Sequence, residues 1–221
     1  MKMKNIAAVA MAGCMAASLA ACGGSASSAA TDASSAASTE AATSEATEAT
    51  GTSANGFTVQ LGSNPETLDP ALNSSIDGAN TIITTFEPLL LIDENNEVVP
   101  GQADLPEVSE DGLTWTFTMK DGLKWSDGSD LTAKDFEYSF KRLACPDTAA
   151  PYAETVVGMI DGYQDAIGNP DADGNTTTDP DWDALNVVAS EDGKDLTITL
   201  SYPCSYFDKL AAFVATSPVQ Q

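Results

Sequence analysis

The stretch that decides the fold runs from Leu113 to Leu143 and reads LTWTFTMKDGLKWSDGSDLTAKDFEYSFKRL. Its first seven residues alternate strictly, with large apolar side chains at every second position and threonines between them. Successive side chains of a strand lie on opposite faces of the sheet, so this alternation predicts a half-buried strand over 113–119. Threonine and the aromatic residues in this run also favour strands.

Two turns and a helix are predicted after this strand. Lys120–Gly122 and Ser126–Gly128 each end in glycine, which supplies the backbone freedom that a reversal needs. Thr132 stands three residues before Asp135, which is the spacing of a capping box at the start of a helix. The Cys145–Pro146 step should end this helix. Its apolar residues recur at i, i+4 and i+7 and define the inner face: Phe136, Phe140 and Leu143.

These motifs resemble a known family. The KWSDG turn, the TAKDF helix start, the aromatic helix with Arg142 and the Pro151–Tyr152 step follow one another here. The same order is found in the extracytoplasmic oligopeptide- and dipeptide-binding proteins of bacterial ABC importers, solute-binding protein family 5. The resemblance extends from about Phe57 to the last residue. It implies an α/β fold with mixed sheets, as part of a two-lobed periplasmic-binding-protein-like (type II) fold.

The N-terminus has the pattern of an export signal. Residues 1–21 carry Lys2 and Lys4, followed by an uncharged apolar run that is too short and too rich in alanine for a membrane span. Cys22 follows Leu-Ala-Ala, a sequence that resembles a lipobox, in which the cysteine is acylated. Acylation of Cys22 would anchor the protein at the membrane face. The alternative is an ordinary signal peptide with a chance cysteine.

Residues 22–56 are predicted to form a disordered tether. They are almost entirely Ser, Ala, Thr and Gly and contain no aromatic residue, so they cannot bury enough apolar area to offset the entropy of ordering. Such a tether either lets a folded domain move above a membrane partner or spaces it through a thick cell wall.

The resemblance also implies a division of the remaining chain. Residues 57–92 would begin the large ligand-binding lobe, and 93–221 would form the small inserted α/β subdomain. In the resembled family, a step similar to Ser217–Val219 opens the return to the large lobe. We therefore expect that the chain is incomplete.

Shorter patterns predict the other elements. Strands are predicted at 57–61 and 88–92, the second with both faces covered because residues 89–92 are all apolar. A hairpin is predicted over 187–200 around a Glu-Asp-Gly-Lys turn. The spacing of apolar residues predicts helices at three places, namely 76–86, 152–167 and 205–213.

The composition excludes several classes of function. The formal net charge of −24 opposes binding to nucleic acid and to anionic lipid headgroups, although an acidic excess can also serve only to keep a secreted protein soluble. The chain contains no histidine, so a Ser-His-Asp or Cys-His catalytic arrangement is excluded within it. We therefore expect no enzymatic activity, no catalytic residue and no cofactor.

Metal binding is not predicted either. Residues 169–177 partly match a calcium-binding loop, but its twelfth position is Pro180 instead of a bidentate acid. A solvated turn is the preferred interpretation. Zinc would have only Cys145 and Cys204 available, and neither belongs to a CxxC motif.

Cys145 and Cys204 have a second possible role. A pair of cysteines can oxidise outside the cytosol, so one hypothesis is a disulfide between them, and the alternative is two free thiols. A titration of thiols in unfolded, unreduced protein distinguishes the two.

A protein that binds varied peptides must hold their constant features, which are the main-chain groups and the charged termini. The resemblance assigns this role to the segment Ser74, Ser75 and Ile76, and it places Tyr152 against the ligand. The alternatives are a plain loop for the segment and core packing against Phe140 for Tyr152. The most recognisable motif residues, Trp125, Asp127 and Gly128, are interpreted as a structural turn.

Taken together, the resemblance implies a monomeric solute-binding lipoprotein that captures oligopeptides for an ABC permease. The ligand would lie between two lobes, and the permease would recognise the closed form. Two alternatives remain open. The same fold could bind a dipeptide, nickel chelate, haem, sugar or signalling peptide, or it could serve as a surface interaction or adhesion domain without transport.

Overall fold

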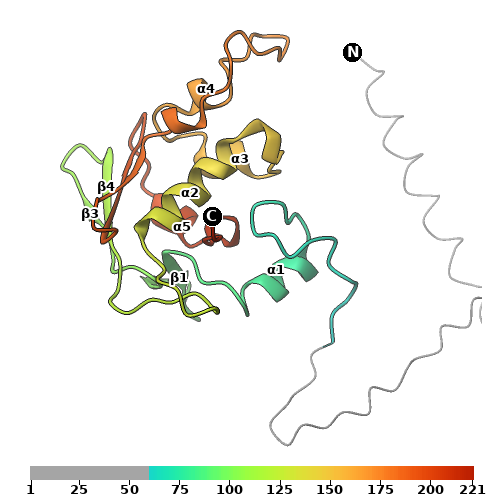
Figure 1. The fold of residues 1–221 in the computed structure, drawn as a ribbon, viewed down its shortest axis with the longest axis vertical. Coiled ribbons are helices and arrows are strands. Elements are labelled where there is room, and N and C mark those ends of the chain that lie inside the picture. Colours follow the sequence, from blue (N-terminus) through green and yellow to red (C-terminus); the bar gives the residue numbers. More distant parts are fainter. Residues whose placement is uncertain (1–59) are drawn as a thin grey trace, which may run out of the picture. The chain divides into compact units, whose positions relative to one another are not determined.

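The computed structural model describes residues 60–221 (Figure 1). The predicted signal peptide, the acylation of Cys22 and the tether lie outside these residues, as do the first three residues of the strand predicted at 57–61. The remaining two residues of that prediction are not in a strand. The described residues belong to one compact unit.

A four-stranded antiparallel sheet forms the centre of this unit. The strand order is β3-β4-β6-β5, so the central strands β4 and β6 are neighbours although α2 and the helices after it come between them in the chain. The bounds are Glu107–Val108 for β3, Thr114–Thr118 for β4, Val187–Ala189 for β5 and Asp195–Thr199 for β6. The predicted strand and hairpin are thus confirmed.

One face of this sheet is buried and the other faces solvent. Trp115 pairs with Ile198 and Phe117 pairs with Leu196, and all four side chains are buried. The opposite face carries threonines, and the Thr118 hydroxyl donates a hydrogen bond of 2.8 Å to the Asp195 carboxylate. The alternation in sequence therefore corresponds to the two faces of the sheet.

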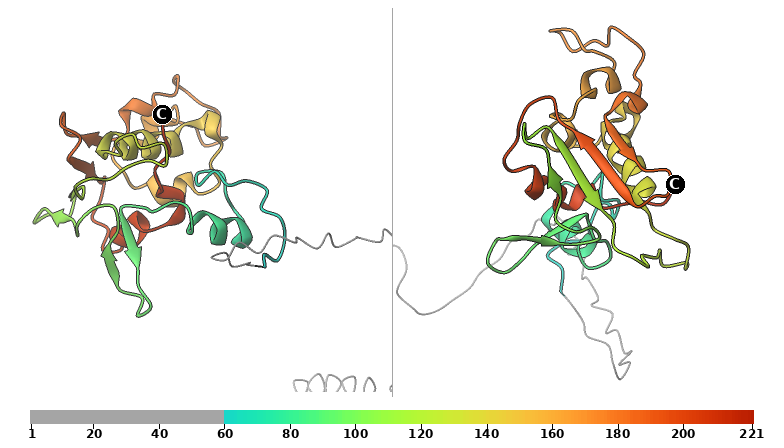
Figure 2. Two further views of the ribbon diagram at one scale, coloured as in Figure 1. Left: turned by 60° about the horizontal axis from the view of Figure 1, so that its bottom comes forward. Right: turned by 90° about the vertical axis from the view of Figure 1, so that its left-hand side faces the viewer.

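Helix α2 (Ala133–Ala144) packs against β5 and β6 on the buried face (Figure 2). Its predicted inner residues are all buried, namely Phe136, Phe140 and Leu143. The capping box is present: the Asp135 carboxylate accepts a hydrogen bond of 2.8 Å from the Thr132 amide, and the Thr132 hydroxyl accepts one of 3.3 Å from the Lys134 amide. The helix ends at Cys145, as predicted.

Replacement of Thr132 by alanine should lower the free energy of unfolding by about 1 kcal/mol, because the first turn of α2 loses its side-chain cap. Urea denaturation of the mature protein would measure this loss. Thr132→Ser keeps the hydroxyl and should remain near the wild type. An equal loss for both variants would show that the cap does not stabilise α2.

The helix predicted over 152–167 is instead two short helices, α3 (Ala153–Val157) and α4 (Tyr163–Ala166). Between them the backbone of Ile160 bridges to Leu200 beside β6, and the Asp161 amide donates to the Thr199 carbonyl over 2.9 Å. This contact with the sheet replaces the helical hydrogen bonds. The apolar residues at helical spacing are nevertheless all buried, namely Val156, Met159, Ile160 and Tyr163.

The strand predicted over 88–92 is β1 (Leu90–Ile92), which pairs only with β2 (Val98–Pro100) in a two-stranded hairpin. Leu89 and Leu90 are fully buried, but Ile92 is 44% exposed, so the prediction that both faces are covered was wrong at the end of the strand. Because this hairpin has only two strands, no third strand of the described residues lies beside Ile92 to cover it. All named strand pairs of residues 60–221 are antiparallel, in contrast to the mixed sheets that were expected.

The other helices are short. α1 (Ile76–Ile82) ends four residues before the predicted position, where the Thr84 and Thr85 hydroxyls donate to the Thr81 carbonyl. α5 (Phe207–Ala211) lies within the predicted range 205–213 and brings Phe207 edge-on against Trp115. Three single turns of 3-10 helix complete the structure, namely η1 (Pro146–Thr148), η2 (Trp182–Ala184) and η3 (Val214–Thr216). Within the described range, every helix is too short or too polar for a membrane crossing.

Candidate functional site

The predicted peptide-contact segment, Ser74, Ser75 and Ile76, leads into helix α1. Ser75 is the N-cap, and its hydroxyl accepts a hydrogen bond of 3.1 Å from the Gly78 amide. The buried Asn73 side chain holds the peptide groups of Ser75: its oxygen accepts from the Ser75 amide at 3.3 Å, and its nitrogen donates to the Ser75 carbonyl at 3.1 Å. Ser75 therefore has a structural role in addition to the predicted one.

Asn73 was missed by the sequence reasoning, although it directly precedes the segment. Its position depends on Gly78, because a Cβ at residue 78 would lie 1.9 Å from the Asn73 side-chain oxygen. Because the peptide groups of Ser75 are bonded to Asn73, a ligand could use only groups of Ser74 and Ile76 in this segment. The peptide N–H and C=O of Ser74 make no hydrogen bond with other described residues, and Ile76 is 81% exposed.

Tyr152 lies directly before α3 and is half-buried. Its ring packs edge-to-face on Phe213, with 5.2 Å between the ring centroids, so its aromatic partner is Phe213 instead of Phe140. Its hydroxyl has no hydrogen-bond partner within residues 60–221. The ring is thus fixed by packing, whereas the hydroxyl is left for solvent or a ligand.

An ion pair that the sequence reasoning did not predict lies close to this segment. The Arg142 guanidinium donates two hydrogen bonds to the Asp69 carboxylate, at 2.9 and 2.5 Å. Asp69 also organises its own turn, because its carbonyl accepts from the Leu72 and Asn73 amides at 3.2 and 3.1 Å. Arg142 belongs to one of the motifs quoted above, but Asp69 is 73 positions away in the chain, and no local pattern connects the two residues.

The hydrogen bonds from Arg142 are the main cause that holds the pKa of Asp69 below its usual value of 3.8. A lowered pKa in the folded state means that the ion pair contributes its full stability above about pH 4 and loses it as the pH falls through the folded-state value. We therefore expect the contribution of the pair to be constant at neutral pH and reduced at an acidic pH below the usual carboxyl value of 3.8. Urea denaturation at both pH values measures this, and Asp69→Asn should show a smaller loss on acidification than the wild type.

The turn Trp125–Gly128 joins the strand layer to helix α2. The Trp125 indole donates to the Asp135 carboxylate at 3.3 Å, and the Asp127 carboxylate accepts from the Ser129 amide at 2.9 Å. The Ser129 hydroxyl is the main cause that lowers the pKa of Asp127 to about 2. Gln220 also donates to Asp127, so the turn contacts the last described residues as well. These contacts support a structural role for the turn.

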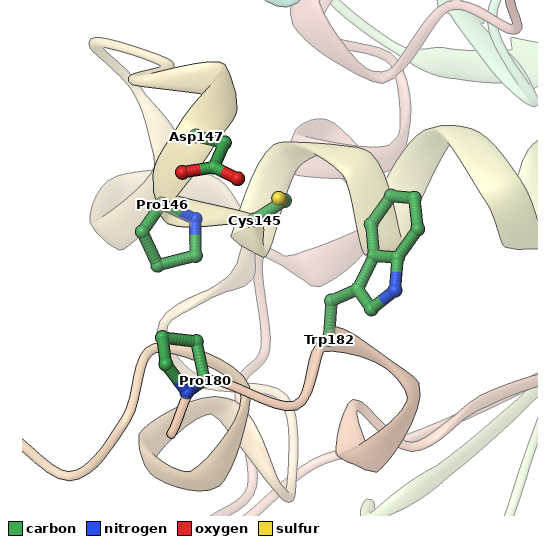
Figure 3. A pocket seen from close by; sticks show the side chains of 5 residues that line it. All are labelled: Cys145, Pro146, Asp147, Pro180 and Trp182. Carbon is green, nitrogen blue, oxygen red and sulfur yellow. The ribbon is translucent and has the colours of Figure 1, made fainter. Parts of the chain in front are cut away.

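A pocket of about 500 Å³ lies at the end of α2 (Figure 3). The five residues that line it come from the C-cap of α2 and from η1 on one side and from the region of η2 on the other, namely Cys145, Pro146, Asp147, Pro180 and Trp182. It includes none of the predicted peptide contacts.

Cys145 and Cys204 are both free thiols, so the disulfide hypothesis is not realised in the structure. Cys145 borders this open pocket, whereas Cys204 is buried before α5.

Acidic side chains do not gather into a metal site in the described part of the chain, where no three residues of the types His, Cys, Asp and Glu come together suitably. In the loop that partly matches a calcium-binding motif, the Asp171 carboxylate accepts hydrogen bonds of 2.9 Å from the Asp173 and Asn175 amides. Asp171 thus organises a turn.

The C-terminal part of the chain, which includes the motifs between residues 113 and 143, matches a family model. The model described as bacterial extracellular solute-binding proteins, family 5 Middle, aligns with residues 97–221. The chain belongs to this family. The motifs quoted above lie within the match, and the resemblance inferred from them is confirmed.

Relatives in solute-binding family 5 share both sequence and fold with the chain. The periplasmic oligopeptide-binding protein OppA of Salmonella typhimurium is 38% identical over 159 residues, which are 72% of this chain and 27% of that protein. The structure of the Escherichia coli murein tripeptide binding protein MppA is 38% identical, with a TM-score of 0.62, over 71% of this chain and 29% of that one. The crystal structure of Haemophilus influenzae OppA in complex with RPPGFSPFR is 28% identical, with a TM-score of 0.64, over 72% and 29%.

The chain therefore spans about a quarter of the length of the family 5 relatives that it matches. The predicted α/β class and the likeness to periplasmic binding proteins are confirmed over that quarter.

Proposed function

We propose that the chain is part of an extracytoplasmic solute-binding protein that captures oligopeptides for import by an ABC transporter. The observation that carries this proposal is the 38% identity, over 159 residues, to the oligopeptide-binding protein OppA of Salmonella typhimurium. The family consists of solute-binding proteins, which bind a ligand and do not transform it. Within the chain itself, the absence of histidine agrees with a binding role.

The proposed peptide contacts are Ser74, Ser75, Ile76 and Tyr152. Their environments support different roles. Ser74 offers an exposed peptide group that can hydrogen-bond a main chain of any sequence, whereas Ser75 supports the segment from within. Ile76 offers apolar surface, and Tyr152 offers a hydroxyl on a ring held by Phe213.

The remaining parts of the proposal concern the location and partners of the protein. Acylation of Cys22 would anchor it to the cell membrane, and residues 23–56 would tether the folded part near an ABC permease. Residues 57–92 would belong to the large ligand-binding lobe and 93–221 to the small subdomain.

Cys22→Ser removes the thiol that would be acylated, so the exported variant should be found in the soluble fraction after cell fractionation. Unchanged association of the variant with the membrane would contradict the lipid anchor.

A thermal-shift screen of the mature protein without the lipid anchor, against a mixed tri- to hexapeptide library, tests the ligand. At a peptide concentration of about one hundred times Kd, binding should stabilise the folded state by about 2.7 kcal/mol, which is a measurable shift. If the protein holds the charged amine of the peptide, acetylation of the peptide N-termini should abolish the shift.

The same screen separates the alternatives. A shift only with a sugar, a nickel chelate or haem would keep the transport role and change the ligand. No shift with any small ligand would contradict solute capture and favour a surface interaction or adhesion role.

A further inference from the structure

Residues 60–86, which contain the proposed peptide-contact segment, bond almost entirely among themselves. The Asp77 carboxylate accepts hydrogen bonds from the Gly62 and Ser63 amides at 3.3 and 3.0 Å, and Asn73 holds Ser75. Within the described part of the chain, the hydrogen bonds between residues 60–86 and all later residues are the two from Arg142 to Asp69. Arg142 is thus the polar connection between this segment and the rest of the fold.

A short series of contacts leads from Arg142 to the peptide-contact segment. One Asp69 carboxylate oxygen accepts from both Arg142 and the Ala71 amide, and the Asp69 carbonyl accepts from the Asn73 amide at 3.1 Å. Asn73 then bonds both peptide groups of Ser75. Each contact after Asp69 joins residues only two to four positions apart, so a displacement of Asp69 would be passed on to Ser74 and Ser75.

The position of Arg142 is itself well determined. It lies in the last turn of α2, next to the buried Leu143, and its side chain is only 20% exposed, against 27% for Asp69. The planar guanidinium binds both carboxylate oxygens at once, which fixes the orientation of the partner as well as its distance. A lysine ammonium at the same place could not do this.

We propose that Arg142 is a positioning residue for peptide binding. Through Asp69 and Asn73, it places the exposed peptide group of Ser74 relative to α2 and to the element that carries Tyr152. This inference rests on the proposed function, because it assigns Ser74 to the peptide site.

Asp69→Asn and Arg142→Lys in the mature protein test the inference, with tetra-alanine as the peptide. Both variants should raise Kd about tenfold, which corresponds to the loss of one well-oriented contact. In hydrogen exchange, the Leu72 and Asn73 amides should exchange faster, while the amides in the middle of α2 stay protected. Lys141→Gln is the matched control, because Lys141 is the neighbouring cation on α2 but pairs with Glu137 and Asp183 instead of residues 60–86. It should leave Kd unchanged.

The reversed pair, Asp69→Arg with Arg142→Asp, restores the ion pair but not the acceptor for the Ala71 amide, so it should recover part of the affinity, which a general loss of stability would not. Unchanged tetra-alanine binding in Asp69→Asn, with wild-type protein that does bind, would overturn the positioning role alone. Unchanged exchange at Leu72 and Asn73 in both single variants would also overturn it. A wild-type protein that binds neither tetra-alanine nor the peptide library would instead refute the proposed function.

Discussion

Phe136→Ala is expected to lower the free energy of unfolding by about 3–5 kcal/mol, because it removes a complete aromatic ring from a packed interior and leaves a cavity. Phe136 is fully buried on the face of α2 that packs against the sheet, where Phe117 and Leu196 are also fully buried. Since small folded proteins have a total stability of about 5–15 kcal/mol, much of the variant should unfold under mild conditions. Urea denaturation followed by tryptophan fluorescence measures the loss.

Tyr202→Ala is the matched control for Phe136→Ala. Tyr202 also carries an aromatic ring, but it is 54% exposed in the loop after β6. Its removal should change the stability by less than about 0.5 kcal/mol. Comparable losses for the two variants would contradict the assignment of the core to the layer between α2 and the sheet.

Gly162→Ala is expected to destabilise the fold by about 3 kcal/mol. Gly162 directly precedes α4 as its N-cap, with φ at 82°, a left-handed conformation that is unfavourable for alanine. In addition, a Cβ at this position would lie 1.9 Å from the carbonyl oxygen of Ala184, which belongs to a separate turn of the chain. One of the two backbone segments would have to move, and both contribute to the core through neighbours such as Tyr163 and Leu185.

Gly174→Ala separates the two causes. Gly174 has almost the same backbone conformation, with φ at 83°, but a Cβ there would have no atom within 4 Å. This variant should therefore lose only the conformational part, about 1–2 kcal/mol. Thermal or urea unfolding of both variants provides the comparison. A similar loss at the two positions would mean that the close approach to Ala184 is unimportant.

Local patterns predicted the strand, turns and capped helix between residues 113 and 143 correctly. The alternation of β4 and the pairing of Thr132 with Asp135 depend on residues a few positions apart, which the backbone brings together in any tertiary context. The family motifs lie in the same stretch, so family membership could also be recognised there.

Predictions that depended on distant contacts were less successful. The pattern over 152–167 identified the buried residues but not the break between α3 and α4, because the amide of Asp161 bonds to Thr199 of β6. Similarly, residues 89–92 are uniformly apolar, yet the exposure of Ile92 depends on which segments lie beside the hairpin. The same limit applied to the candidate site: the role of Asn73 beneath Ser75 became apparent only in three dimensions.

Residues close together in the chain thus specify the secondary structure of residues 113–143, the buried face of this stretch and the family. How the segment that carries Ser74 is held follows only from the folded structure, because the Asp69–Arg142 pair joins residues 73 positions apart. The periodicity of apolar residues and helix capping depend on residues two to four positions apart, so both can be recognised in a short stretch of sequence. An ion pair between distant segments leaves no such local pattern, and only the folded chain brings its two partners together.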